Sequence, residues 1–138
     1  MSNGVKKDTT EYILFPMGIY YIGDLAYVIK NKNWNKFVDK MENSPRLRNG
    51  KGKCVYNKHE FWWHETFWGH GNTIVEDNLK NEYTIVTDSL GICPIEMVER
   101  KFKKETEKCY ILAFTEDFYV RYDCGIFEFG DIIINSMM

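Results

Sequence analysis

The stretch from Glu60 to Trp68 carries the widest range of chemically useful side chains in the chain. If it forms a strand, successive side chains point to opposite faces. The face richer in plain phenyl rings is the better core candidate; it holds Phe61, Trp63, Glu65 and Phe67. The other face carries indole, imidazole and hydroxyl groups, from Trp62, His64, Thr66 and Trp68. These groups could stack on and hydrogen-bond a planar ligand such as a nucleobase.

We therefore predict a ligand site on the face of Trp62, His64, Thr66 and Trp68, with His70 in the adjoining loop between two glycines. The alternative is a strand with both faces buried, in which a helix covers this face and the tryptophans are core residues.

The histidines do not predict a metal site. Together with a cysteine they follow the spacing Cys-x4-His-x4-His-x5-His, through Cys54, His59, His64 and His70. Structural zinc sites use closer pairs on a turn, and their ligands must converge on one ion. On a continuous strand His59 and His64 would point to opposite faces. We expect no metal and no cofactor.

A small hydrolase is the second functional hypothesis. His64 or His70 could act with a carboxylate as an acid and base, since histidine titrates near neutral pH. For His64 the available carboxylates are Glu65, Glu76, Asp77 and Asp88. No nucleophile motif such as GxSxG and no phosphate-binding glycine loop accompanies them.

The cysteines predict a reducing compartment. Cys54, Cys93, Cys109 and Cys124 show no CxxC spacing, and a chain of 138 residues can build a core without disulfides. We expect buried, reduced thiols and a cytoplasmic location.

Composition narrows the class of protein. The formal charge of -2 gives no excess positive field for general nucleic-acid or anionic-membrane binding. No apolar run reaches the ~20 residues of a membrane helix, and the polar start does not resemble a signal peptide. We expect a flexible tail over residues 1–10 and a single globular domain over 11–138. A homo-oligomer is left open.

One helix is predicted, from Asn33 to Met41. Its apolar residues recur at i, i+3, i+4 and i+7, as Trp34, Phe37, Val38 and Met41. Asn33 is expected to cap its amino end. We expect the apolar side to be buried against a sheet, and a shorter helical stretch over Ile95–Lys104.

Short strands account for most of the remaining pattern. Aromatic residues make up 16% of the chain, and turn residues recur at short spacing, which favours antiparallel pairing. Expected strands are Tyr12–Phe15, Gly18–Ile22, Leu25–Ile29, Glu60–Trp68, Asn72–Asp77, Glu82–Thr87, Tyr110–Phe114, Phe118–Tyr122, Ile126–Phe129 and Ile132–Ile134. Residues Arg46–Lys53 are expected to form an exposed loop. The predicted fold is α+β, mostly antiparallel β, as a sandwich or partly open barrel with the helix packed on the sheet.

Several local patterns together carry a resemblance. They are Tyr21-Ile-Gly-Asp24 before the predicted helix, Gly69-His-Gly71, Leu90-Gly-Ile-Cys-Pro94 and Gly125-Ile-Phe-Glu-Phe-Gly-Asp-Ile-Ile-Ile134. The arrangement resembles a group of short uncharacterised proteins of phages, giant viruses and bacteria. The resemblance implies a viral or bacterial setting and no particular activity.

The function that we expect is that of a non-enzymatic binding module. Its ligand would be a nucleotide-like small molecule or a host protein, sequestered through the aromatic and histidine face in the host cytoplasm. The alternatives are the small hydrolase and a structural component of a virion or scaffold.

Overall fold

The computed structural model describes residues 10–42, 51–65, 72–87, 89–101, 109–123 and 125–135, with backbone alone for 41, 42, 51, 52, 64, 65, 72 and 89. The described elements, in chain order, are β1 (Glu11–Phe15), β2 (Gly18–Asp24), the 3-10 helix η2 (Leu25–Tyr27), α1 (Asn31–Glu42), β3 (Lys51–Tyr56), β4 (His59–Glu65), β5 (Asn72–Glu76), β6 (Glu82–Val86), β7 (Ser89–Pro94), the 3-10 helix η5 (Ile95–Met97), β8 (Cys109–Phe114), β9 (Phe118–Asp123), β10 (Ile126–Phe129) and β11 (Ile132–Asn135).

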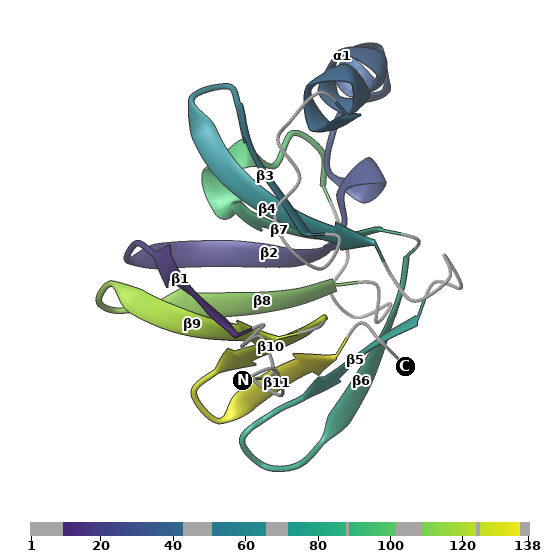
Figure 1. Ribbon diagram of the computed structural model, residues 1–138. Helices are drawn as coiled ribbons and strands as arrows, with labels where there is room; N and C mark the ends of the chain where they lie inside the picture. The colour runs from purple at the N-terminus through teal and green to yellow at the C-terminus, as the bar shows by residue number, and fades with distance from the viewer. Residues whose placement is uncertain are drawn as a thin grey trace, which may run out of the picture.

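The strands form two sheets that pack face to face. A six-stranded sheet has the order β1-β9-β10-β11-β5-β6, and a five-stranded sheet has the order β3-β4-β7-β2-β8. Neighbouring strands are antiparallel throughout both sheets. Figure 1 shows α1 beyond the five-stranded sheet, away from the six-stranded one. The predicted α+β fold, mostly antiparallel with one helix on a sheet, is confirmed as a sandwich that does not close into a barrel.

The two sheets are joined at a corner where consecutive strands change sheet. β1 belongs to the six-stranded sheet, where it pairs with β9. β2 belongs to the five-stranded sheet, where it pairs with β8. Pro16 and Met17 form the bend between β1 and β2, and the backbone N–H of Met17 donates to Asp117 Oδ1 at 2.9 Å. The Tyr20 hydroxyl donates to the Pro16 carbonyl at 2.6 Å, which fixes the bend from the five-stranded side.

The space between the sheets is filled by apolar side chains from both. This inter-sheet core consists of Phe15, Tyr20, Ile22, Trp62, Val75, Ile85, Leu90, Ile92, Leu112, Val120, Tyr122, Phe127, Phe129 and Ile134. Side chains alternate between the two faces of a strand, so every second residue of these strands points into the space between the sheets and joins this core.

A second core lies between the five-stranded sheet and the helices. This helix-side core consists of Tyr21, Leu25, Val28, Ile29, Phe37, Cys54, Tyr56, Phe61, Trp63, Cys93, Met97 and Cys109. Phe37 is fully buried, stacks on Phe61 at a centroid distance of 5.1 Å and meets Tyr56 edge-on at 5.2 Å. Trp34 and Val38 are partly buried against the same core. The predicted apolar face of the helix is confirmed at these three positions.

A glycine makes room for the 3-10 helix η2 on the outer surface of the five-stranded sheet. Gly91 on β7 lies between Gly23 on β2 and Trp63 on β4. Leu25 packs into the space above it, and a Cβ atom built on Gly91 would lie 2.2 Å from Leu25 Cγ. Any larger residue at position 91 must therefore displace Leu25.

Three predicted elements differ in the structure. No part of Leu25–Ile29 is a strand: it begins with the 3-10 helix η2, because the Asp24 carboxylate accepts the Ala26 N–H at 2.8 Å and caps it, and residues 28–29 form a turn. The helix predicted over Ile95–Lys104 is a single 3-10 turn, and residues 102–108 lie outside the described part. The helix α1 starts at Asn31, so Asn33 lies inside it and does not cap it.

The predicted loop Arg46–Lys53 ends too late, since β3 starts at Lys51. β3 turns into β4 through Asn57 and Lys58, whose φ angles of 50° and 67° are those of a tight hairpin turn. Of the predicted tail, only Thr10 is described; its hydroxyl bonds to Asp123 Oδ2 at 3.5 Å and accepts from Arg121 at 3.3 Å.

Candidate functional site

Trp62 is the one predicted ligand-binding residue whose side chain the structure describes, and it is 2% exposed. Its indole stacks on the ring of Phe15 at a centroid distance of 4.2 Å and an interplanar angle of 24°. Phe61 and Trp63 are buried on the opposite face of β4. The expectation of an open face is thus wrong at Trp62, because β1 of the other sheet covers it.

The side chains of the remaining predicted binding residues lie outside the part of the chain that the structure describes. The backbone of His64 lies in β4 between Lys51 of β3 and Leu90 of β7, and its side chain is outside the described part. Thr66, Trp68 and His70 also lie outside it. Their role as ligand contacts stays a prediction.

Two of the carboxylates considered for a hydrolytic site are engaged in their own hairpin, β5–β6. Glu76 pairs with Lys80 at 3.2 Å, and the Asp77 carboxylate accepts the N–H groups of Leu79 and Asn81 at 2.9 Å each. Burial alone would raise the pKa of Asp77, but these donors outweigh it and lower that pKa. Among the residues that the structure describes, histidine, cysteine and acidic side chains form no group of three that could hold a metal ion.

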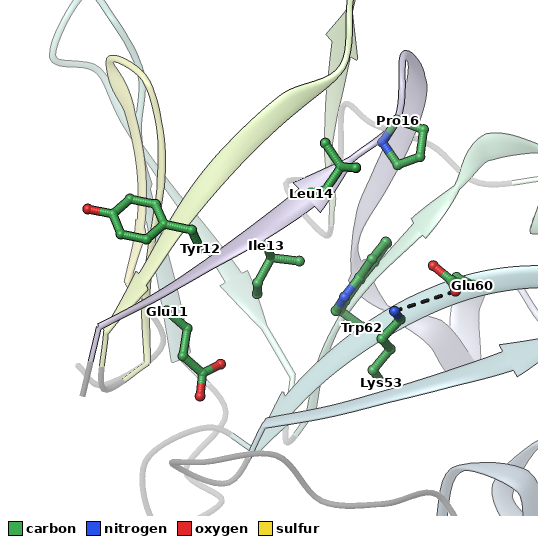
Figure 2. Close-up of a pocket in the computed structure, with 8 residues that line it drawn as sticks. All are labelled: Glu11, Tyr12, Ile13, Leu14, Pro16, Lys53, Glu60 and Trp62. Carbon is green, nitrogen blue, oxygen red and sulfur yellow. Dashed lines mark ion pairs between the residues drawn. The ribbon is translucent and has the colours of Figure 1, made fainter. Parts of the chain in front are cut away.

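A cleft opens beside Trp62, between β1 of one sheet and the β3–β4 hairpin of the other (Figure 2). Its volume is about 350 Å³, within the usual range for ligand sites. The lining residues are Glu11, Tyr12, Ile13, Leu14, Pro16, Lys53, Glu60 and Trp62. Of these, the sequence singled out only Trp62 as a binding residue. The others become neighbours through the packing of two sheets, which the local pattern does not encode.

The cleft exists because the two sheets end at different places. β1 is the last strand of the six-stranded sheet and covers Trp62 on β4. β3 lies one strand further out, and its Lys53 is in register with Trp62 on the inner side of the five-stranded sheet. Val55, two residues along on the same side, is 51% exposed. The inner surface of β3 therefore extends beyond the edge of the opposite sheet.

An ion pair borders this extension. Lys53 Nζ lies 3.4 Å from Glu60 Oε1, with both side chains about half exposed, and Figure 2 shows the pair next to Trp62. The Tyr20 hydroxyl donates to the carbonyl of Pro16, one of the lining residues. Burial, with a smaller contribution from nearby carboxylates, raises the pKa of Tyr20 to about 12, so this hydroxyl remains a donor at neutral pH. The lining of the cleft thus combines apolar side chains with three charged ones, those of Glu11, Lys53 and Glu60.

Glu99 forms a second polar cluster that the sequence did not predict. Its carboxylate accepts hydrogen bonds from the Lys30 N–H at 3.0 Å, the Asn33 amide at 3.1 Å and the Tyr56 hydroxyl at 3.0 Å. Burial alone would raise the pKa of Glu99, but these donors outweigh it and the pKa is lowered. The cluster ties α1 to the β3–β4 hairpin and to the segment after η5.

The described cysteines, Cys54, Cys93 and Cys109, are buried thiols and not disulfides. Burial, followed by the nearby Glu96 carboxylate, raises the pKa of Cys93 to about 12. A thiol with so little thiolate at neutral pH is a poor nucleophile. Cys124, the fourth cysteine, lies outside the described residues.

None of the described helices combines the length and apolar character needed to cross a membrane. Comparison of the chain with protein-family models, with curated proteins and with solved structures finds no match.

Proposed function

We propose that this protein is a non-enzymatic binding module and that the cleft between β1 and β3–β4 receives its ligand. The observation that carries the proposal is an unfilled volume of about 350 Å³ whose described lining combines apolar side chains with the half-exposed ion pair of Lys53 and Glu60. Ligand sites in proteins are mostly apolar concavities with a few polar groups that orient the ligand. The open end of a β-sandwich provides such a concavity without disturbing either core.

The charge of the lining bears on the ligand. Two carboxylates, Glu11 and Glu60, and one ammonium group, Lys53, line the cleft. Lys53 and Glu60 pair with each other, and Trp62 is too deeply buried to offer a ring face to a nucleobase, which weighs against the nucleotide-type ligand expected from the aromatic strand. A segment of another protein fits the proposal better. In the viral setting that the sequence resemblance implies, it would belong to a host factor.

The proposed location is the cytoplasm. The three described cysteines are buried thiols, and thiols of this kind are typical of proteins from reducing compartments.

The proposal is tested by a titration of isotope-labelled protein, followed by two-dimensional NMR. The titrants are a fragment library of neutral and cationic small molecules, capped dipeptides and a set of nucleotides. We expect shift changes to concentrate on Glu11–Phe15 and on the β3–β4 hairpin. The Ile13→Ala variant should weaken this response, because Ile13 lines the cleft and points from β1 toward Trp62 (Figure 2).

The control variant is Val86→Ala on β6, at the other edge of the six-stranded sheet, where the side chain is 61% exposed. It should respond to the titrants like the unmodified protein. Shift changes confined to residues away from the cleft, or turnover of a titrant, would reject the proposed function.

A further inference from the structure

β6 is the last strand of the six-stranded sheet, at the end opposite β1. It pairs with β5 along its whole length, from Glu82 opposite Glu76 to Val86 opposite Asn72. No strand of the described residues pairs with its other side, and Figure 1 shows β6 on the outer side of β5. An edge strand of this kind is a template on which another chain can pair.

The register of the β5–β6 hairpin fixes which backbone groups of β6 point outward. The Asp77 N–H donates to the Asn81 carbonyl at 3.0 Å, so Asn81 directs its backbone groups toward β5. This direction alternates from one residue of an antiparallel strand to the next. Tyr83 and Ile85 therefore bond to β5. The residues whose N–H and C=O groups point to the outer edge are Glu82, Thr84 and Val86.

The side chains of β6 do not protect this edge. Proteins commonly guard edge strands with lysine, proline or a bulge. β3, an edge of the other sheet, carries Lys53 at its centre, whereas β6 has the sequence Glu-Tyr-Thr-Ile-Val and a regular register with β5. Tyrosine, threonine, isoleucine and valine all favour strands. The edge is therefore suited to receive a further strand.

Tyr83 lies where a further strand would cover it. It is on the inner face of β6, because its partner on β5, Val75, is fully buried. Ile85, on the same face, is also fully buried, but Tyr83 is 38% exposed. Its ring contacts that of Tyr110 on β8 at a centroid distance of 5.8 Å. A strand placed beside β6 would cover part of the ring that this contact leaves exposed.

The hairpin that presents β6 is held in shape by its own turn. The Asp77 carboxylate accepts the N–H groups of Leu79 and Asn81 at 2.9 Å each. The hydroxyl of Tyr83 donates to the same carboxylate. An edge that is already ordered loses little conformational entropy when a second strand pairs with it.

A second copy of β6 matches this edge residue by residue. If two β6 strands pair over their full length across a two-fold axis, Thr84 lies opposite Thr84 of the second copy. Glu82 then lies opposite Val86, and Tyr83 lies opposite Ile85. The outward N–H and C=O groups of the two strands meet as hydrogen-bonded pairs. Threonine with threonine, and an aromatic with a β-branched residue, are favourable cross-strand pairs.

The charges of this arrangement present no obstacle. Glu82 is the one charged residue of β6, and it faces a valine. The two Glu82 side chains are separated by the length of strand from Glu82 to Val86, which is about 14 Å. This exceeds the Debye length of about 10 Å at 0.1 M salt. The formal charge of -2 per chain adds little repulsion between copies.

We propose that two copies of the chain pair through their β6 strands, centred on Thr84, so that two six-stranded sheets join into one. The two-fold axis uses the same edge of both copies, which closes the assembly as a dimer. The interface lies at the opposite end of the sheet from β1, which lines the cleft, so the inference goes beyond the proposed function and is independent of it. A single strand pair is a small interface, and we expect a Kd on the order of 0.1 mM.

The test follows the full-length protein by sedimentation velocity from about 1 μM to 1 mM, where monomers should give way to dimers. Hydrogen exchange over the same range reports on the strand. The amides of Glu82, Thr84 and Val86 should exchange about half as fast when half of the chains are dimeric. The amides of Tyr83 and Ile85 already bond to β5, and their exchange should not change with concentration.

A charge swap at Thr84 tests the two-fold register. Thr84→Lys and Thr84→Glu each place like charges opposite one another, and each should weaken association about two- to fivefold. An equal mixture of these two variants should restore it, because a lysine then faces a glutamate. Thr84→Val adds no charge and should keep the dimer.

Two controls accompany the charge swap. Thr84 is exposed, so urea unfolding should show the fold intact in all three variants. Tyr119→Lys changes a side chain that is 66% exposed on β9, away from the edge, and should leave association unchanged.

Monomers at all concentrations up to about 1 mM would overturn the inference. So would association that is insensitive to both charges at Thr84, or that proceeds without slowed exchange of the Thr84 amide, because the contact would then lie on another surface. Slow exchange of this amide at every protein concentration would mean that the same chain covers the edge, which also overturns it. A dimer that forms as described while no titrant shifts the cleft supports the inference and counts against the proposed function.

Discussion

Replacing Trp62 by alanine separates a core role from a ligand-stacking role. Trp62 is 2% exposed and stacks on Phe15 at 4.2 Å, so its removal leaves a cavity between the sheets. Truncation of a buried tryptophan costs about 3–5 kcal/mol. The total stability of a domain is about 5–15 kcal/mol, so the variant should lose a large share of it. Denaturant unfolding, with an unchanged slope, gives the free energy directly.

Two matched variants make this measurement decisive. Trp62→Phe keeps a ring against Phe15 and should lose distinctly less stability than the alanine variant. Tyr12→Ala removes an aromatic residue that lines the same cleft but is 67% exposed, and should change stability by about 0.5 kcal/mol or less. If Trp62→Ala cost under about 1 kcal/mol, the packing of β1 on β4 would be wrong and an open face at Trp62 would be restored.

Other consequences of the packing can be measured in the same way. Gly91→Ala should cost about 1–3 kcal/mol, because the new Cβ collides with Leu25; in Leu25→Ala protein the same change should cost less, and additive losses would contradict the contact. Because the pKa of Glu99 is lowered from its ordinary value of 4.5, its ionised carboxylate stabilises the fold at pH values above 4.5. This stabilisation is lost as the pH falls through the lowered pKa. Glu99→Gln should therefore lose less stability on acidification than the unmodified protein, and equal acid profiles in urea titrations would refute the role of the cluster. The thiol of Cys93, with a pKa of about 12, should react with iodoacetamide at about pH 8 only after unfolding, and mass spectrometry showing rapid labelling of native protein would contradict its burial.

Local pattern was sufficient for the β5–β6 hairpin and for the helix face. The β5–β6 hairpin follows from two alternating runs around a polar turn, in which Asp77 bonds the backbone of Leu79 and Asn81. Phe37 follows from helical periodicity, and its burial is confirmed. The residue pattern gave the wrong element where a side-chain cap competes with strand propensity. Asp24 converts the start of a β-branched and aromatic run into a 3-10 helix.

The candidate site could not be predicted because its parts come from distant segments. Alternation along β4 separates Trp62 from Phe61 and Trp63 correctly, but it does not tell which layer covers each face. That depends on β1, which reaches Trp62 only through the packing of the two sheets. β3 was missed because lysine and glycine at its start read as a loop, and the Asn57-Lys58 turn lacks the glycine that marks most such hairpins.

The pairing of β1 with β9 has a consequence for the order of events during synthesis. The Met17 N–H and the Asp117 carboxylate that close the corner are 100 residues apart in the chain. At a translation rate of about 5–20 residues per second, Asp117 is made roughly 5–20 s after Met17. During that interval the apolar strand β1 has neither β9 beside it nor the completed corner. A nascent chain of this protein thus holds the apolar strand β1 without its partner until β9 has been made, and during that time β1 is open to chaperones that bind early-emerging segments.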